Sequence, residues 1–482
     1  MLFNSLTYAI FLPIVFATYW LLRKNVKLQN SFLLLASYVF YAYWDWRFLG
    51  LLFGMSFLSW IGGRKIANTP EGGGRCQFVK KLLLVSIVAI DLMVLGAFKY
   101  YNFFVGSFAD LFGLQNSIHS LKIVLPLGIS FFTFQAIAYV VDVYKRKIGP
   151  TNLVDCLLYI GFFPKLLAGP IERPTNLIPQ IQKPRFFEYD LAVDGCRQML
   201  WGLFKKVVIA DNAALYVNQV YDDYANQSGS TLLLAAILYT IQIYGDFSGY
   251  SDMAIGTAKL FGFRFRDNFL FPYFSRNMNE FWRRWHISLN TWFVDYVYIP
   301  LGGSRNGKWH TIRNIMIVFL LSGLWHGADW SYVAWGAYHG LLLVLLILLN
   351  RNTKYEHVVA YDRWYPNLKE LGQMVLVFVF ATFGWMMFRA DNMTQFIDYI
   401  ARMCSADLLS APMLINRAYY VPTFLAIGTM FLVEWCQRYK KHGLEVYHAE
   451  RYRWLRIIAY YVLIIAILQF AGDDQVFIYS QF

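Results

Sequence analysis

The sequence predicts an all-α membrane protein with many transmembrane helices. Of its 482 residues, 58% are hydrophobic and only 15% are charged, whereas about 25% of an average soluble domain is charged. Apolar runs recur along the whole chain, and each approaches the roughly 20 helical residues needed to cross a hydrocarbon core of about 30 Å. Because backbone polar groups find no water at that depth, these runs are expected to be helical.

Twelve apolar runs are predicted to be membrane-crossing helices, in a single membrane-embedded domain that covers residues 1–482. The polar intervals between the runs are too short to bury a core of their own. The predicted helices cover residues 6–22, 30–45, 48–62, 82–101, 121–141, 197–213, 231–248, 314–329, 331–350, 371–388, 419–436 and 456–471.

The positions of the basic residues predict which loops face the cytoplasm. Lys and Arg gather at 23–27, 64–81 and 145–147, whereas 102–120 and 214–229 contain neither. Cytoplasmic loops carry the excess of Lys and Arg, so these two acidic loops and the N-terminus are expected outside. The net charge of +13 is then explained by anionic lipid rather than by nucleic acid.

Two stretches do not fit a simple spanning helix. Residues 157–174 are apolar but contain Pro164, Gly169 and Pro170, and residues 277–305 are aromatic yet rich in charge. Broken helices persist at membrane depth only where protein or a water-filled cavity surrounds them. Both stretches are therefore predicted to be re-entrant walls of a site.

A polar segment follows the predicted helix 231–248. "GDFSGYSD" (245–252) is expected to end the helix there, and its residues would either line a funnel or cap and join two helices. Its polar residues are Asp246, Ser248, Tyr250, Ser251 and Asp252. The five cysteines show no metal-binding or disulfide spacing and are expected in the core.

Two histidines in apolar surroundings are the main candidates for chemistry. An ionisable group near bilayer depth costs about 2.5–3.5 kcal/mol on insertion scales and so requires a reason. Taken alone, His326 in "SGLWHGADW" fits a turn with interfacial tryptophans, and His286 in "FWRRWHISLN" fits packing on an interfacial helix. As a pair they favour a site, because each directly follows a tryptophan, Trp285 or Trp325. A neutral imidazole, with an ordinary pKa of about 6.5, can take a proton from a hydroxyl.

The other polar side chains in these stretches have a plain structural interpretation beside the functional one. Ser288, Asn290, Asp295 and Tyr298 are candidates to line the re-entrant wall, although helix packing would also explain them. His339 is expected to pack, or to hydrogen-bond a neighbouring helix. The remaining histidines are expected to be solvated: His119, His310, His357, His442 and His448. No zinc-protease, serine-hydrolase or nucleotide-binding motif occurs in a suitable context.

These motifs resemble those of a known family. "NEFWRRWHISLNTWFVDYVYIPLGG" (279–303) followed by "SGLWHGADWSYVAWGAYHG" (322–340) is similar to the paired histidine motifs of membrane-bound O-acyltransferases, and most similar to their bacterial branch around the alginate O-acetyltransferase membrane subunit. Further segments agree in order: "LPLGISFFTFQAIAYVVDVYK" (125–145), "AGPIERP" (168–174), "QIYGDFSGYSDMAIGTAKLFGF" (242–263), "FGWMMFRA" (383–390) and "FIYSQF" (477–482).

The resemblance implies a fold and a set of site residues. The fold would be a ring of about 11–12 transmembrane helices with re-entrant segments around a central channel. His326 would be the essential histidine and general base, and His286 the second motif histidine. Trp285, Trp325, Ser288, Asn290, Asp295 and Tyr298 would be candidates to line the substrate channel.

The resemblance also implies the reaction and its partners. An acyl group, with acetyl preferred, would pass from a cytoplasmic pantetheine thioester such as acetyl-coenzyme A across the bacterial inner membrane. It would reach hydroxyls of an exported polysaccharide through an extracytoplasmic partner protein. No metal and no permanently bound cofactor is implied. Two alternatives remain: D-alanyl transfer from a carrier protein toward teichoic acid, and a transporter or channel in which buried histidines relay protons.

Overall fold

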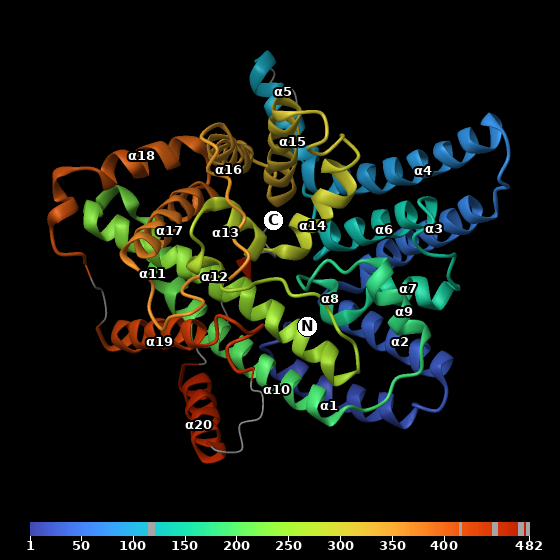
Figure 1. Ribbon diagram of the computed structural model, residues 1–482, viewed down its shortest axis with the longest axis horizontal. Coiled ribbons are helices and arrows are strands. Elements are labelled where there is room, and N and C mark those ends of the chain that lie inside the picture. Colours follow the sequence, from blue (N-terminus) through green and yellow to red (C-terminus); the bar gives the residue numbers. More distant parts are fainter. Residues whose placement is uncertain (114–120, 414–416, 446–451, 471–476, 479–482) are drawn as a thin grey trace. The chain divides into compact units, whose positions relative to one another are not determined.

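A computed structural model describes residues 1–113, 121–413, 417–445, 452–470 and 477–478 (Figure 1). Within these ranges every regular element is a helix and there is no β-strand. The predicted all-α fold class is confirmed.

The chain divides into two compact units. The first comprises Met1–Cys196 and Ala254–Arg266. It contains α1 (Leu6–Leu21), α2 (Val26–Asp45), η1 (Trp46–Phe48), α3 (Leu49–Asn68), α4 (Gly74–Leu95), η2 (Gly96–Tyr100), α5 (Tyr101–Phe112), α6 (Ile129–Tyr144), α7 (Leu153–Gly161), α8 (Phe163–Leu166), α9 (Pro174–Gln182) and the start of α10 (Tyr189–Leu203).

The second unit comprises Arg197–Met253 and Asp267–Phe482. Its elements are η3 (Phe204–Ala210), α11 (Asp211–Asp222), η4 (Tyr224–Asn226), most of α12 (Gly229–Leu260), η5 (Pro272–Phe274), α13 (Met278–Arg284), α14 (Ile287–Phe293), η6 (Val294–Tyr298), α15 (Lys308–His326), α16 (Trp330–Leu348), α17 (Leu368–Arg389), α18 (Met393–Met403), η7 (Ala406–Leu409), α19 (Arg417–Cys436) and α20 (Arg453–Phe470). That the whole chain forms one domain stays a prediction.

Several helices have the length and composition of membrane spans. In the described part of the chain, five pass that test: Gly74–Phe112, Gly229–Leu260, Trp330–Leu348, Leu368–Arg389 and Arg453–Phe470. Three shorter helices are also apolar: Leu6–Leu21, Ile129–Tyr144 and Tyr420–Cys436. Each of the eight overlaps a predicted run. The number of crossings and the central channel stay predictions.

The helix ends follow local side-chain chemistry. Asn25 caps α2 by accepting a hydrogen bond from the backbone N–H of Leu28, and Asn367 with Glu370 forms a capping box on α17. The helix predicted over 121–141 starts later, at Ile129, because Pro126 lacks an N–H and Gly128 has a φ of 77°.

The segment "GDFSGYSD" does not break the helix, so the predicted break is wrong, whereas a funnel-lining role for its residues stays a prediction. Residues 245–252 lie inside α12, a single helix of 32 residues. Asp246 pairs with Lys206 at 2.7 Å and Asp252 with Lys205 at 2.7 Å, both lysines lying on the π-helical segment η3. Because these acids have buried partners, the helix does not need to end where they occur.

Two predicted outer loops are helical over much of their length. Residues 102–112 belong to α5, and residues 214–222 belong to α11; residues 114–120 lie outside the described part. The cysteine prediction also fails in part, since Cys156 is buried but Cys196, Cys404 and Cys436 are exposed.

The first predicted re-entrant stretch contains a broken helix. α7 ends at Gly161, α8 covers four residues, and the backbone from Leu167 to Arg173 is irregular until α9 begins. Glu172 is fully buried there, and its carboxylate accepts hydrogen bonds from the Asn176 side chain (2.7 Å) and the Arg266 backbone N–H (2.5 Å).

Candidate functional site

The second predicted re-entrant stretch is broken at His286. α13 ends at Arg284 and α14 begins at Ile287, and between them His286 has φ 44° and ψ 52°. A non-glycine residue in this left-handed region is uncommon, and such strain costs about 1–3 kcal/mol. The conformation persists only if the surroundings hold it in place.

Two asparagines hold the break. The backbone carbonyl of Asn268 accepts from the N–H of Ile287 (2.9 Å), and its side-chain oxygen accepts from the Ser288 hydroxyl (2.9 Å). The Asn290 amide donates to the carbonyl oxygens of Trp282 (2.5 Å) and Trp285 (2.6 Å). These bonds satisfy the carbonyls left open where α13 ends, and they fix the backbone on both sides of His286.

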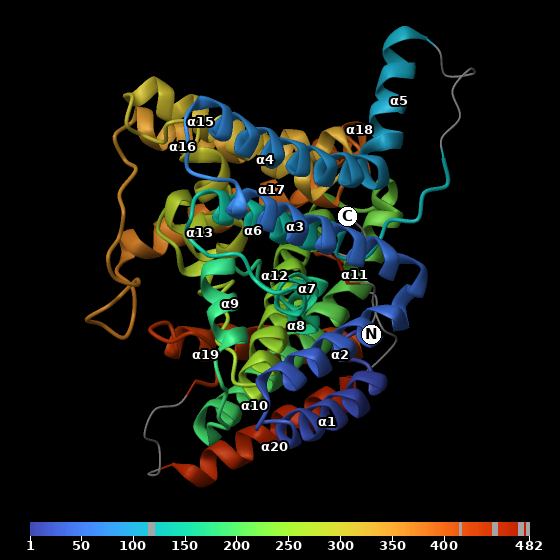
Figure 2. The ribbon, with the colours of Figure 1, turned by 90° about the vertical axis from the view of Figure 1, so that its right-hand side faces the viewer.

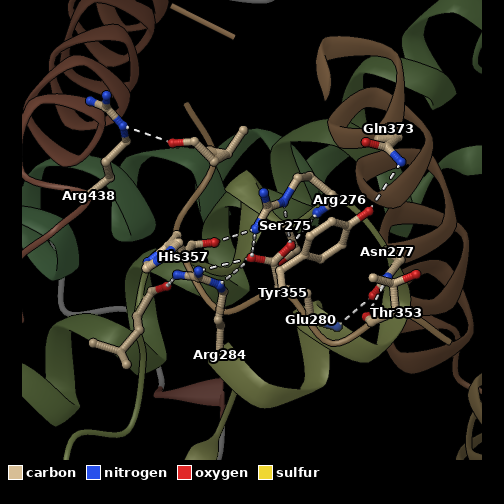
Figure 3. Close-up of polar contacts among 12 residues, drawn as sticks. Ser275, Arg276, Asn277, Glu280, Arg284, Thr353, Tyr355, His357, Gln373 and Arg438 are labelled. Carbon is tan, nitrogen blue, oxygen red and sulfur yellow. Dashed lines mark hydrogen bonds and ion pairs between the residues drawn. The ribbon is translucent and has the colours of Figure 1, made fainter. Parts of the chain in front are cut away.

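A polar cluster anchors the start of α13 (Figure 3). The Asn277 side chain caps the helix by accepting from the N–H of Glu280 (2.8 Å). The Glu280 carboxylate forms ion pairs with Arg276 (3.1 Å) and Arg284 (3.0 Å). The Arg276 guanidinium also lies 3.6 Å from the ring centroid of Tyr355. The segment that leads to His286 is therefore fixed at both ends.

His326 is the last residue of α15, beside a close crossing of α15 and α16. A Cβ at Gly323 would overlap the Tyr332 carbonyl oxygen, and a Cβ at Gly336 would overlap that of Phe319. Glycine at both positions lets the two backbones approach. The crossing brings the His326 ring edge-on to Trp335, with centroids 5.0 Å apart.

The two candidate histidines meet in the second unit. Their ring centroids are 6.4 Å apart, and the imidazoles belong to residues that are only 1% (His286) and 3% (His326) exposed. Trp325 contacts both, at 5.9 Å from His286 and 5.0 Å from His326. Residues 40 positions apart in sequence thus form one buried aromatic cluster.

The interfacial interpretation of His326 is partly right. Residues 327–329 do form the turn between two helices, and Asp329 caps α16 by accepting from the N–H of Ser331 (2.7 Å). Trp330 is 58% exposed, whereas Trp325 is only 4% exposed and faces the histidines. One of the two flanking tryptophans is therefore part of the cluster rather than of a surface belt.

The other predicted site residues fall into two groups. Trp285, Ser288 and Asn290 lie at the helix break. The Trp285 ring packs on Trp385, with ring centroids 4.7 Å apart. Asp295 and Tyr298 lie further on, in the π-helical turn η6, and are partly exposed. That any of them lines a channel stays a prediction.

Sequence reasoning missed several residues that contribute to this region. Asn268 does not belong to any of the motifs singled out in the sequence. Lys205 and Lys206, both buried, lie inside the predicted helix 197–213. Near the C-terminus, the Phe477 ring stacks on Tyr250 at 4.6 Å, and the backbone N–H of the next residue, Ile478, donates to Asp246 (2.8 Å). Phe247 of the same helix lies 4.6 Å from the His286 ring. Residues 479–482 of the "FIYSQF" motif lie outside the described part.

The other histidines separate into packed and exposed ones. His339 is fully buried against Trp282 and Trp335, and its ring nitrogens have no hydrogen-bond partner among the described residues, which confirms packing without a bond to a neighbouring helix. His310 and His357 are exposed as expected, but His442 is buried, so the prediction for it was wrong. His119 and His448 lie outside the described residues.

Comparison with known proteins identifies the class. Residues 77–389 match the membrane-bound O-acyltransferase family model. The chain is 41% identical over 438 residues to the "Probable alginate O-acetylase" of Pseudomonas aeruginosa, covering 90% of this chain and 80% of that protein. It is 31% identical over 532 aligned positions to a peptidoglycan O-acetyltransferase of Helicobacter pylori (100% and 98% covered). It is also 31% identical to the teichoic acid D-alanyltransferase of Bacillus subtilis, covering 54% of this chain and 68% of that protein.

The protein is thus a helical, multi-pass membrane enzyme that transfers acyl groups to oxygen. It belongs to the membrane-bound O-acyltransferase family, which confirms the resemblance seen in the paired histidine motifs.

Proposed function

We propose that this O-acyltransferase passes an acetyl group from a cytoplasmic thioester toward hydroxyls of an exported polysaccharide, with His326 as general base. The observation that supports the proposal best is the pair of buried imidazoles, 6.4 Å apart, where a helix break meets a helix end.

The chemistry needs one base and no net change of protons. A neutral His326 imidazole takes the proton of the acceptor hydroxyl as its oxygen attacks the thioester carbonyl. The tetrahedral intermediate then expels the thiolate, which recovers the proton from the imidazolium. His286, held by Asn268 and Asn290, is proposed to orient the acceptor or the donor beside it.

The donor is proposed to be acetyl-coenzyme A or another pantetheine thioester that visits the site and is not held permanently. Coenzyme A and carrier proteins are both acidic, and the basic loops at 23–27, 64–81 and 145–147 suit either. A partner protein outside a bacterial inner membrane is proposed to complete transfer to the polymer.

Acetyl transfer is favoured over D-alanyl transfer by the extent of similarity. The relatives named as O-acetylase and O-acetyltransferase align with 90% and 100% of this chain, whereas the D-alanyltransferase aligns with 54%. The transporter alternative is set aside because the chain belongs to an acyltransferase family.

Ester analysis of exported polymers tests the proposal. Cells lacking the gene, and the same cells complemented with it, are compared by mass spectrometry and NMR of purified envelope polymers. Acetyl esters that disappear on deletion and return on complementation support acetyl transfer to polysaccharide. Loss of D-alanyl esters instead would overturn the proposed donor, and loss of neither would overturn both donor and acceptor.

A further inference from the structure

The helix that starts with α4 is too long for a single crossing. Gly74–Phe112 covers 39 residues, or about 58 Å at 1.5 Å per residue, whereas a hydrocarbon core is about 30 Å thick. The 22 residues of α4 alone, about 33 Å, are sufficient. The π-helical turn η2 follows, and beyond it α5 points in a clearly different direction from α4 in both views (Figures 1 and 2).

α5 carries an exposed aromatic stripe. Its large apolar side chains recur at helical spacing on one face, and the residues concerned are Tyr101 (40% exposed), Phe104 (57%), Phe108 (52%), Leu111 (77%) and Phe112 (59%). The other face carries Asn102, Gly106 and Asp110. Asn102 ties that face to the returning chain, since its amide donates to the Leu121 carbonyl (2.8 Å) and accepts from the Leu121 N–H (2.9 Å).

We propose that α5 lies in the plane of the membrane, at the end of α4 opposite the basic 64–81 loop, with its aromatic stripe in the boundary between headgroups and acyl chains. Amphipathic helices with aromatic apolar faces lie in this way, and Tyr and Trp concentrate at that depth. The preceding helix α4 also presents apolar side chains suited to lipid, among them Val85 (54% exposed) and Met93 (63%).

The composition favours a lipid surface over a charged partner. Residues 101–113 contain no Lys or Arg, and their one acid, Asp110, lies away from the stripe. Binding therefore rests on apolar burial. If α5 instead continued straight across the core, Asn102 and Asp110 would be placed in hydrocarbon, which is costly.

Spin-label accessibility tests the placement without depending on the enzyme's substrate. In a variant with the five native cysteines replaced, a single nitroxide is attached at Phe108→Cys, in the stripe, or at Gly106→Cys, on the opposite face. A Cβ at Gly106 meets no atom within 4 Å, so the control site tolerates a side chain. The protein is reconstituted in liposomes, and collision rates with oxygen and with a neutral nickel chelate are measured.

The expected result is an oxygen-to-nickel ratio several-fold higher at Phe108 than at Gly106, with a Phe108 depth near the headgroup boundary. Equally low oxygen-to-nickel ratios at both sites would place α5 in water and overturn the proposal. A depth at the bilayer centre would show that α5 spans the core. Low collision rates with both reagents at Phe108 would show that protein covers the stripe.

Discussion

His286 shows how a single residue can define this site. Its left-handed backbone turns α13 into α14 and directs the chain so that the imidazole faces Trp325 and His326. The sequence identified the two histidines and their tryptophans, because ionisable groups in apolar runs are rare. It did not reveal the backbone conformation, which depends on Asn268 and Asn290 folding onto the break from other positions.

Asn290→Leu is predicted to destabilise the protein. Two buried carbonyls, those of Trp282 and Trp285, lose their donor, and each such loss costs about 1–3 kcal/mol. Thermal unfolding in detergent should show a lower midpoint, corresponding to about 2–6 kcal/mol in total. Asn306→Leu, at an exposed position, should change stability by less than about 0.5 kcal/mol. An unchanged midpoint for Asn290→Leu would mean that the asparagine does not hold the break.

At the scale of elements, close helix contacts decide where the side chains meet. α15 and α16 cross at Gly323 and Gly336, and this crossing sets His326 against Trp335. The apolar runs predicted both helices, but they could not predict which faces would touch, because glycines in a membrane helix also occur without a contact.

Gly336→Ala and Gly372→Ala are predicted to have opposite effects. The first places a methyl group against the Phe319 carbonyl and should destabilise by about 1–3 kcal/mol through overpacking. The second adds a methyl group to an exposed helical position with no atom within 4 Å and should stabilise by about 0.5–1 kcal/mol. Thermal unfolding of the two variants in the same detergent checks the sign. Equal shifts would show that the crossing is not tight.

Breaking a buried ion pair should destabilise the protein more than breaking an exposed one. Asp246→Asn removes a buried partner of Lys206, and breaking such a pair costs about 3–5 kcal/mol. Asp398→Asn breaks a surface pair with Arg402, which solvent screens, so its loss should change stability little. Unfolding midpoints of the two variants measure the contrast. A small effect at Asp246 would show that Asp211, the second acid on Lys206 at 2.8 Å, is sufficient.

For the whole molecule, composition predicted the class of protein and most of its helices. Hydrophobic runs of spanning length are a strong signal, since lipid permits few other structures. The errors fell at polar segments. "GDFSGYSD" looked like a break because the sequence does not show that Lys205 and Lys206 neutralise its acids. Residues 102–112 looked like a loop because the preceding apolar run is already long enough to span the membrane at residue 101, and Asp110 follows it.

The orientation in the membrane can be tested by labelling a native cysteine. Cys76 lies in the first turn of α4 beside the basic loop, which the distribution of Lys and Arg assigns to the cytoplasm. In a variant whose only cysteine is Cys76, a membrane-impermeant maleimide should label inverted vesicles but not intact spheroplasts. Gly106→Cys in a cysteine-free background should show the reverse pattern. Labelling of Cys76 from outside would invert the proposed topology.

The proposed catalytic role of His326 is tested most directly by comparing two histidines on one helix. His326→Gln and His310→Gln both alter α15, but His326 lies in the buried pair and His310 is exposed. The O-acetyl content of exported polysaccharide is measured in cells that contain equal membrane levels of each variant. If His326 is the general base, we expect a fall of about 10²-fold or more for His326→Gln, the contribution of such a base, and no change for His310→Gln. Normal acetylation with His326→Gln would contradict a catalytic role for the pair.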